Sequence, residues 1–151
     1  MEKIYLFLVI VFFNFSICFS ATRTSTQSGS WSSSSTWVGG VVPTSSDNVI
    51  IAAGHNVTLS ANTSIVNLTI QTGGVFDDNN KTMTVTGNFV IDGVYKGQKD
   101  LTLTGSGTTI DGYGEVKNTG KWILSGNKTI NSTAFINKTG SPLQVNASTT
   151  I

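Results

Sequence analysis

Short runs of alternating apolar and polar residues dominate the chain from Asp47 onward. Val, Ile and Leu fill most of the apolar positions, Thr fills many of the alternate ones, and Gly or Asn residues separate the runs. No stretch keeps apolar residues at i, i+3, i+4 and i+7 long enough to predict a helix. Alternation with a period of two between turn residues is typical of strands, so the body of the protein is predicted to be all β.

The runs also recur with a longer period, in three separate registers. The spacings within these registers settle near twenty residues. A sandwich built of hairpins does not require a common period of this kind in three registers. It predicts a right-handed parallel β-helix (a β-solenoid) with about 20 residues per coil, in which inward side chains stack from coil to coil. The registers are Leu68/Ile70, Met83/Val85, Leu101/Leu103, Trp122/Leu124 and Leu143/Val145; then Ile91, Ile110, Ile130 and Ile151; then Val94, Val116 and Ile136.

Residues 1–20 have the pattern of a signal peptide. Lys3 precedes an apolar run of about ten residues, which is too short to span a membrane as a helix. Cys18 and Ser20 are small residues at the −3 and −1 positions of a cleavage before Ala21. The alternative is a lipoprotein modified at Cys18, but the bulky Ile17 stands where a small residue is wanted before such a cysteine. We therefore expect a secreted or cell-surface protein with no membrane span after signal removal and no cysteine in the mature chain.

The remaining chain divides into two parts. Residues 21–46 form a leader rich in Ser and Thr, which we expect to act as an N-terminal cap carrying Trp31 and Trp37. Residues 47–151 form the solenoid coils. Because the chain stops at Ile151, inside a predicted ladder, we expect the solenoid to be incomplete at this end. It is then either a fragment of a longer protein or a chain that self-associates end to end.

Composition excludes several classes of function. The chain has 151 residues, enough for one domain but not for a large enzyme with two domains. Charged residues make up only 11%, and the formal net charge is +1. A chain with so little net charge lacks the electrostatic field that attracts nucleic acid or anionic membranes. We expect neither partner, and the sequence indicates no cofactor.

Three residues are candidates for ligand binding. Trp31 and Trp37 have aromatic faces that suit the apolar faces of sugar rings. The alternative is that both close the open end of the core. His55, in the turn Gly54-His55-Asn56, is the single histidine. The region offers no partners for a triad or a zinc site. His55 is therefore expected either to contact a ligand or to be a turn residue that bonds the backbone or packs on a Trp.

Carboxylates supply two further candidates. Asp77 and Asp78 lie in an oxygen-rich turn that suits a hard cation such as Ca²⁺, with a solvated turn as the alternative. Asp92 and Asp111 are 19 residues apart in Asp-Gly corners. They either stack on consecutive coils as an acid and base pair or are solvated turn residues. No catalytic residue is assigned, and no metal centre is expected beyond the Asp77–Asp78 candidate.

Part of the chain resembles a known group of proteins. The relevant stretches resemble the N-terminal region of large secreted adhesin-like proteins of Bacteroidetes and, more distantly, the G-eight (eight-glycine) domain of extracellular proteins. This resemblance implies a β-helical module on an exported, often surface-attached protein, with a link to polysaccharides in G-eight proteins. The stretches are Ser28-Gly29-Ser30-Trp31, Thr36-Trp37-Val38-Gly39-Gly40, Pro43, Asp47-Asn48-Val49-Ile50-Ile51 and Gly54-His55-Asn56-Val57-Thr58-Leu59.

Pattern and resemblance together lead to one functional hypothesis and one alternative. We expect an exported structural or adhesive β-solenoid module of a cell-surface or secreted protein that is not itself an enzyme. Its partners would be extracellular polysaccharide or other surface proteins. The alternative is the non-catalytic N-terminal part of a polysaccharide-degrading β-helix enzyme.

Overall fold

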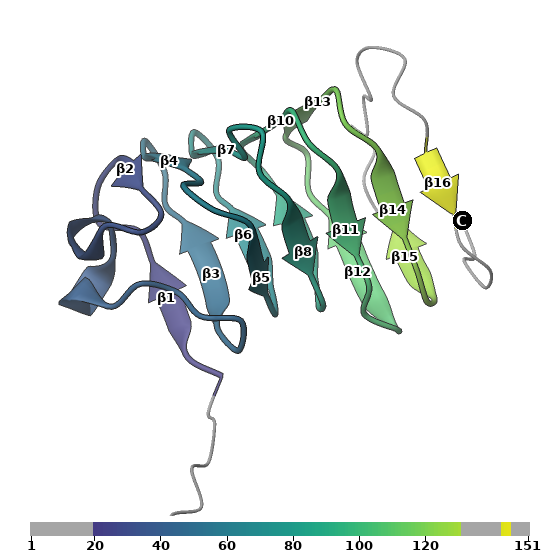
Figure 1. Cartoon of the computed structure of the whole chain (residues 1–151), viewed down its shortest axis with the longest axis horizontal. Helices are drawn as coiled ribbons and strands as arrows, with labels where there is room; N and C mark the ends of the chain where they lie inside the picture. Colours follow the sequence, from purple (N-terminus) through teal and green to yellow (C-terminus); the bar gives the residue numbers. More distant parts are fainter. Residues whose placement is uncertain (1–19, 131–142, 146–151) are drawn as a thin grey trace, which may run out of the picture.

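The computed structural model describes residues 20–130 and 143–145 of the chain. Figure 1 shows short parallel strands stacked side by side along one axis, with the N-terminal strands at one end of the stack. Every ladder between named strands is parallel. The predicted all-β parallel solenoid is therefore confirmed. The predicted signal peptide, residues 1–19 of it, and the predicted open end at Ile151 lie outside the described residues.

The strands form three sheets. Sheet I has the order β1 (Thr22–Thr24), β3 (Asn48–Ile51), β6 (Leu68–Ile70), β9 (Phe89–Ile91), β12 (Thr108–Asp111), β15 (Lys128–Ile130). Sheet II has the order β2 (Gly29–Ser30), β4 (Asn56–Thr58), β7 (Val75–Asp77), β10 (Val94–Gly97), β13 (Glu115–Asn118). Sheet III has the order β5 (Thr63–Ile65), β8 (Met83–Val85), β11 (Leu101–Leu103), β14 (Trp122–Leu124), β16 (Leu143–Val145).

The chain visits the three sheets in turn. One coil runs from β3 in sheet I through β4 in sheet II and β5 in sheet III, and then β6 pairs beside β3. Val49 pairs with Leu68, Leu68 with Phe89, and Phe89 with Ile110, which gives coil lengths of 19, 21 and 21 residues. The predicted length of about 20 residues per coil agrees with these values.

Inward side chains make one continuous core along the axis. Successive residues of a strand point to opposite faces, so the first and third residues of β6, β8, β9, β11 and β14 are buried. Burying these ladders is the main force that holds the coils together. Large rings form part of the core, with centroid separations of 5.0 to 6.0 Å in a chain of contacts through Trp37, Trp31, Phe76, Tyr95, Phe89 and Trp122.

The leader is built into the solenoid rather than lying apart from it. Its strands β1 and β2 extend sheets I and II by one strand each, whereas sheet III ends at β5. Between β2 and β3 lie two short 3-10 helices, η1 (Ser34–Thr36) and η2 (Val38–Gly40). Within the described part of the chain, no helix is long and apolar enough to cross a membrane.

The sheet III register was predicted correctly over most of its length. Met83, Leu101, Trp122 and Leu143 form one ladder, and the partners two residues on form the next. The first predicted pair of this register, Leu68 and Ile70, was wrong, because these residues lie in β6 and pair with Phe89 and Ile91 in sheet I. Their predicted place in sheet III is occupied by Thr63 and Ile65 of β5.

The other two registers needed larger corrections. Ile110 pairs with Ile130 as predicted, but on its other side it pairs with Phe89, not Ile91. Val116 pairs with Tyr95, so the predicted match between Val94 and Val116 was wrong by one residue. The predicted members Ile136 and Ile151 lie outside the part of the chain that the structure describes.

Candidate functional site

The outer face of sheet III carries an open hollow of about 330 Å³ beside β5 and β8. Ile65 and Val85 point into the core, so the residues beside them in each strand face outward. The side chains that line the hollow are amides and hydroxyls, from Asn62, Thr63, Ser64, Thr82 and Thr84. None of these five groups is a general acid or base, so the hollow is suited to hydrogen bonding rather than proton transfer.

Hydrogen bonds between the coils hold part of this lining in place. The Asn62 Oδ1 atom accepts a hydrogen bond of 3.0 Å from the Thr82 N–H on the next coil. Within one coil, the Thr63 hydroxyl donates a hydrogen bond of 3.0 Å to the Ala61 carbonyl. The five lining residues were not among the sequence-based candidates. Ser64 and Thr84 could have been found from their outward position, since they and Thr102 occupy equivalent positions on three consecutive coils. Thr63 shares the register of the core residue Met83, so the alternating pattern does not indicate it.

The tryptophans proposed as a stacking platform are buried in the core. Trp31 is 4% exposed and Trp37 is 1% exposed, and their rings meet edge to face at 5.0 Å. Trp37 Nε1 donates a hydrogen bond of 2.7 Å to the Trp31 carbonyl, and Trp31 also packs against Phe76. Neither ring offers a face to a sugar, so the ligand-binding prediction for this pair was wrong. The alternative, closure of the N-terminal end of the core, is what the structure has.

His55 supports the junction between leader and first coil. Its Nδ1 atom lies 2.9 Å from the hydroxyl of Ser25, and that hydroxyl accepts a hydrogen bond of 2.9 Å from the Ala52 N–H. Ser25 is 2% exposed, so this serine and histidine pair is closed to a substrate. His55 is therefore a structural turn residue, but its ring bonds the Ser25 side chain and not the backbone or a Trp ring as the predicted alternative had it.

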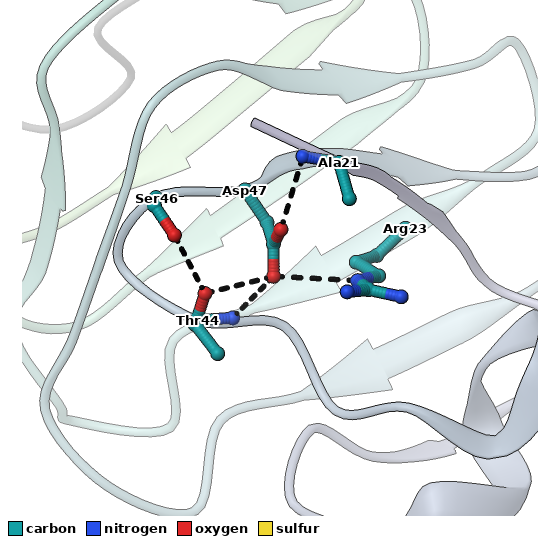
Figure 2. Close-up of polar contacts among 5 residues, drawn as sticks. All are labelled: Ala21, Arg23, Thr44, Ser46 and Asp47. Atoms are coloured by element: carbon teal, nitrogen blue, oxygen red, sulfur yellow. Dashed lines mark hydrogen bonds and ion pairs between the residues drawn. The ribbon is translucent and has the colours of Figure 1, made fainter. Parts of the chain in front are cut away.

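Asp47 joins the leader to the start of β3, as Figure 2 shows. Its carboxylate accepts hydrogen bonds from the Thr44 N–H at 2.8 Å, the Thr44 hydroxyl at 2.9 Å and the Ala21 N–H at 3.2 Å. Arg23 Nε completes the set in an ion pair of 3.3 Å. Burial acts to raise the pKa of Asp47, but these donors outweigh it and hold the pKa below its ordinary value.

Asp78, proposed with Asp77 as a cation ligand, is fully buried. Its carboxylate accepts the backbone N–H groups of Asn80 at 3.0 Å, Gln98 at 2.8 Å and Lys99 at 3.1 Å, with the Tyr95 hydroxyl at 3.4 Å. Burial raises the pKa of Asp78, against the lowering effect of these donors. Burial, with the Asp78 charge second, raises the pKa of Tyr95 well above its ordinary value.

These contacts leave the Asp77–Asp78 turn unsuited to a cation. The Asp77 Oδ1 atom accepts the Asn79 N–H at 2.8 Å, within its own turn. Asp78 faces backbone donors, which a cation would have to displace. The described residues contain no group of three or more His, Cys, Asp or Glu side chains placed to hold a metal ion.

Asp92 and Asp111 do not stack. Asp111 pairs with Val90 in sheet I, so Asp92 lies opposite Tyr113 on the next coil, and its Oδ1 atom accepts the Tyr113 N–H at 3.2 Å. The Asp111 Oδ1 atom accepts the Gly112 N–H at 2.7 Å. The predicted acid and base pair was therefore wrong, because the coil between the two residues is longer than the register assumed.

The comparisons with known proteins give one positive finding. No curated protein and no solved structure is similar enough to this chain to count as a match. The family model of the G8 domain matches residues 36–149, which is more than half of the chain. The match starts at Thr36 in the cap and continues through the coils of all three sheets. The distant resemblance noted in the sequence is thus confirmed, and the chain belongs to the G8 domain family.

Proposed function

We propose that the chain is an exported, non-catalytic β-solenoid module that supplies a rigid structural and adhesive surface to an extracellular or cell-surface protein. The observation that carries this proposal is the use of the acidic side chains. Six aspartates accept hydrogen bonds from backbone N–H groups: Asp47, Asp77, Asp78, Asp92, Asp100 and Asp111. These groups hold turns and join coils, and general acid or base catalysis needs groups that exchange protons with a substrate.

The remaining carboxylate of the described residues and the single histidine are engaged in the same way. The Glu115 carboxylate forms an ion pair of 2.9 Å with Lys117, two residues along the same strand. His55 is hydrogen bonded to the buried Ser25 hydroxyl. Coils that commit the described carboxylates and the single histidine to structural contacts are suited to a scaffold rather than to an enzyme.

The surface chemistry supports contact with glycans. Residues 48–76 contain no Asp, Glu, Lys or Arg, and the hollow beside β5 lies mainly in this neutral part. Amide and hydroxyl groups both donate and accept hydrogen bonds, as sugar hydroxyls do. Export is supported by the N-terminal sequence, in which Lys3 precedes a short apolar run and small residues precede Ala21.

Two measurements test the proposal. Immunoblots of cell, surface and medium fractions, with an antibody against residues 47–130, should find the protein outside the cytoplasm. The purified chain should release no reducing ends and no unsaturated products from neutral or acidic polysaccharides. A protein confined to the cytoplasm would contradict the exported role.

The alternative is that the chain is the non-catalytic N-terminal part of a polysaccharide-degrading enzyme. The mass and the activity of the native product distinguish this alternative from the structural module. A surface or medium band far larger than this chain, with polysaccharide-cleaving activity that co-purifies, would favour the alternative. A band without that activity would favour the structural and adhesive module. Loss of cleavage in Asp92→Asn or Asp111→Asn would contradict the non-catalytic role of these coils.

A further inference from the structure

The two oxygens of the Asp47 carboxylate differ in how fully they are used. Oδ2 accepts the Thr44 N–H at 2.8 Å, the Thr44 hydroxyl at 2.9 Å and Arg23 Nε at 3.3 Å. Within the described residues, the one hydrogen bond to Oδ1 comes from the backbone nitrogen of Ala21, at 3.2 Å. Figure 2 shows the nitrogens of Ala21 and Arg23 on different oxygens. Because a carboxylate oxygen has two lone pairs, Oδ1 can accept more than it receives from an amide.

This carboxylate is shielded from water where the chain enters the solenoid. Asp47 is 2% exposed, so its charge depends on the donors and cations around it. Ala21 is half-buried beside it, whereas Ser20, the residue before, is exposed. A positive charge on the Ala21 nitrogen would therefore meet the negative charge of Asp47 in a site from which most water is excluded.

The predicted first residue of the mature chain is already bonded to the solenoid on both sides. The Ala21 nitrogen contacts Asp47, and the Ala21 carbonyl accepts the Asn48 N–H at 2.7 Å. Strand β1 begins at the next residue, Thr22. No spacer separates the predicted cleavage point from the fold, so cleavage before Ala21 places the new end of the chain against the carboxylate.

We propose that the Asp47 carboxylate is the binding site for the α-amino group of the processed chain, so that removal of the signal peptide completes the N-terminal cap. This inference rests on the proposed export. Hydrolysis of the Ser20–Ala21 peptide bond by a signal peptidase consumes one water and leaves a carboxylate on Ser20 and an amine on Ala21. That amine is protonated at neutral pH, with three hydrogens and a positive charge, whereas the amide of the uncut chain has one hydrogen and no charge.

The geometry suits the charged form of the nitrogen. A hydrogen bond between an ammonium and a carboxylate is about 2.7–2.9 Å long and about twice as strong as one between neutral groups. Only a small movement from the present 3.2 Å brings the Ala21 nitrogen to that distance. Arg23 occupies Oδ2, so the two cations do not compete for one oxygen. The uncut chain keeps only the weaker amide contact, and its cap is less stable.

Two forms of the full processed chain test this proposal, one with a free α-amino group on Ala21 and one with an Nα-acetyl group. Acetylation restores an amide at this nitrogen without restoring the signal sequence. At pH 7 the ratio of folded to unfolded protein, obtained from urea unfolding, should be about tenfold higher for the free amine, because a charge-assisted hydrogen bond replaces a neutral one. Equal ratios would overturn the proposal.

Substitutions then identify the acceptor. In Asp47→Asn the difference between the free and acetylated forms should disappear, because the facing negative charge is gone. Asp111→Asn is the matched control, since it makes the same change at a carboxylate that bonds the N–H of the next residue, and it should keep the full difference. A difference that survives in Asp47→Asn would overturn the assignment of the amine to this carboxylate.

The dependence on pH is a second readout that needs no substitution. An amine paired with a carboxylate holds its proton more tightly in the folded chain, so its contribution is complete below its ordinary pKa of about 8 and is lost as the pH rises through the higher, folded value. Asp47 and Arg23, the charged groups of the described structure at this site, keep their charges over that range. The advantage of the free amine should shrink between about pH 8 and about pH 11, and a constant advantage would overturn the proposal.

The results separate this inference from the proposed function. N-terminal sequencing of the native protein from surface and medium fractions should begin at Ala21. An exported protein that begins at another residue would overturn this inference and leave the exported role standing. A cytoplasmic protein that keeps residues 1–20 would contradict the exported role, whereas the comparison of free and acetylated chains would still report whether Asp47 binds the amine.

Discussion

The backbone nitrogen of Ala21 lies 3.2 Å from the Oδ1 atom of Asp47, at the point where the leader meets the first coil. In a chain cut before Ala21, as the sequence predicts, this nitrogen is the α-amino group, whose ordinary pKa of about 8 keeps it protonated at neutral pH. Asp47 is 2% exposed and also pairs with Arg23. Removal of the signal peptide would therefore convert a hydrogen bond into a second ion pair that fastens β1 to the solenoid.

Replacing Asp47 tests how much this junction stabilises the fold. Asp47→Asn removes the negative charge facing Arg23 and Ala21, and we expect the free energy of unfolding to fall by about 1–3 kcal/mol, because a carboxylate shielded from water loses its charge-assisted hydrogen bonds. Urea unfolding of the chain that begins at Ala21 measures this. Asp111→Asn is the control, since its carboxylate bonds only the next N–H in its own turn, and a change within about 0.5 kcal/mol is expected. Equal effects of the two substitutions would show that the Asp47 contacts add nothing.

The same carboxylate predicts a dependence of stability on pH. The pKa of Asp47 is lower in the folded chain than its ordinary value of 3.8, so the unfolded chain binds the proton first as the pH falls. The stability that Asp47 contributes is complete above that ordinary value and is lost as the pH falls through the lower, folded pKa. Asp78 acts in the opposite sense, because its pKa is raised: its contribution is complete below 3.8 and falls as the pH rises through its folded pKa.

Unfolding midpoints of the unmodified chain and of Asp47→Asn, measured from about pH 7 to about pH 3, separate the two effects. The difference in stability between the two proteins should be constant at neutral pH and should shrink at the acidic end. A difference that stays constant down to the acidic end would contradict the lowered pKa of Asp47.

Comparison of sequence and structure shows which registers a pattern can predict. In sheet III each strand is an apolar-x-apolar triplet with few competing residues nearby, so Met83, Leu101 and Trp122 were aligned correctly. In sheet II, Tyr95 points inward and the aliphatic Val94 beside it is only half-buried. Choosing the aliphatic residue shifted the register by one, which exchanges the two faces of a strand. Tyrosine can be buried here because its hydroxyl reaches Asp78.

The candidate sites were harder to predict because their partners lie a whole coil away. The sequence showed an oxygen-rich turn at Asp77 and Asp78, but two of the donors to Asp78 are the backbone N–H groups of residues 20 and 21 positions later. Likewise, nothing local to Trp31 and Trp37 indicates that the rings pack on each other and on Phe76. Only the coil length of the solenoid relates such positions, and an error of one or two residues in that length changes every partner.

Glycine at one corner is predicted to be essential for stacking the coils. Gly74, Gly93 and Gly114 occupy equivalent positions directly before β7, β10 and β13, and a Cβ atom on Gly114 would collide with the Gly93 carbonyl. Gly114→Ala should therefore reduce the free energy of unfolding by about 2–3 kcal/mol, as overpacking against rigid backbone does. Gly107→Ala is the control, because its φ of +69° disfavours alanine but nothing lies within 4 Å of the added carbon.

We expect Gly107→Ala to cost about 1 kcal/mol, the usual penalty for a left-handed backbone conformation without glycine. Urea unfolding of both variants measures the difference. If Gly107→Ala were the more destabilising of the two, close contact between the corners would not be what requires glycine at residue 114.

The inward and outward faces of sheet III offer the most direct test of the solenoid itself. Leu103 is 1% exposed in the ladder of Val85 and Leu124, whereas Thr102 beside it faces outward and is half-buried. Leu103→Asp places an unpaired carboxylate in the core, so we expect a loss of about 4 kcal/mol or more in unfolding free energy, enough to unfold a marginal domain. Thr102→Asp adds the same charge one residue away and should cost about 1 kcal/mol or less, because water still reaches the carboxylate.

Circular dichroism and urea unfolding compare the two variants. Leu103→Ala provides a measurable value if Leu103→Asp does not fold, since deleting a buried leucine side chain costs about 2–5 kcal/mol and leaves no charge behind. The order of stability should be Thr102→Asp, then Leu103→Ala, then Leu103→Asp. Because a shift of one residue in register exchanges these two positions, a Thr102→Asp variant less stable than Leu103→Asp would mean that β11 turns its other face to the core.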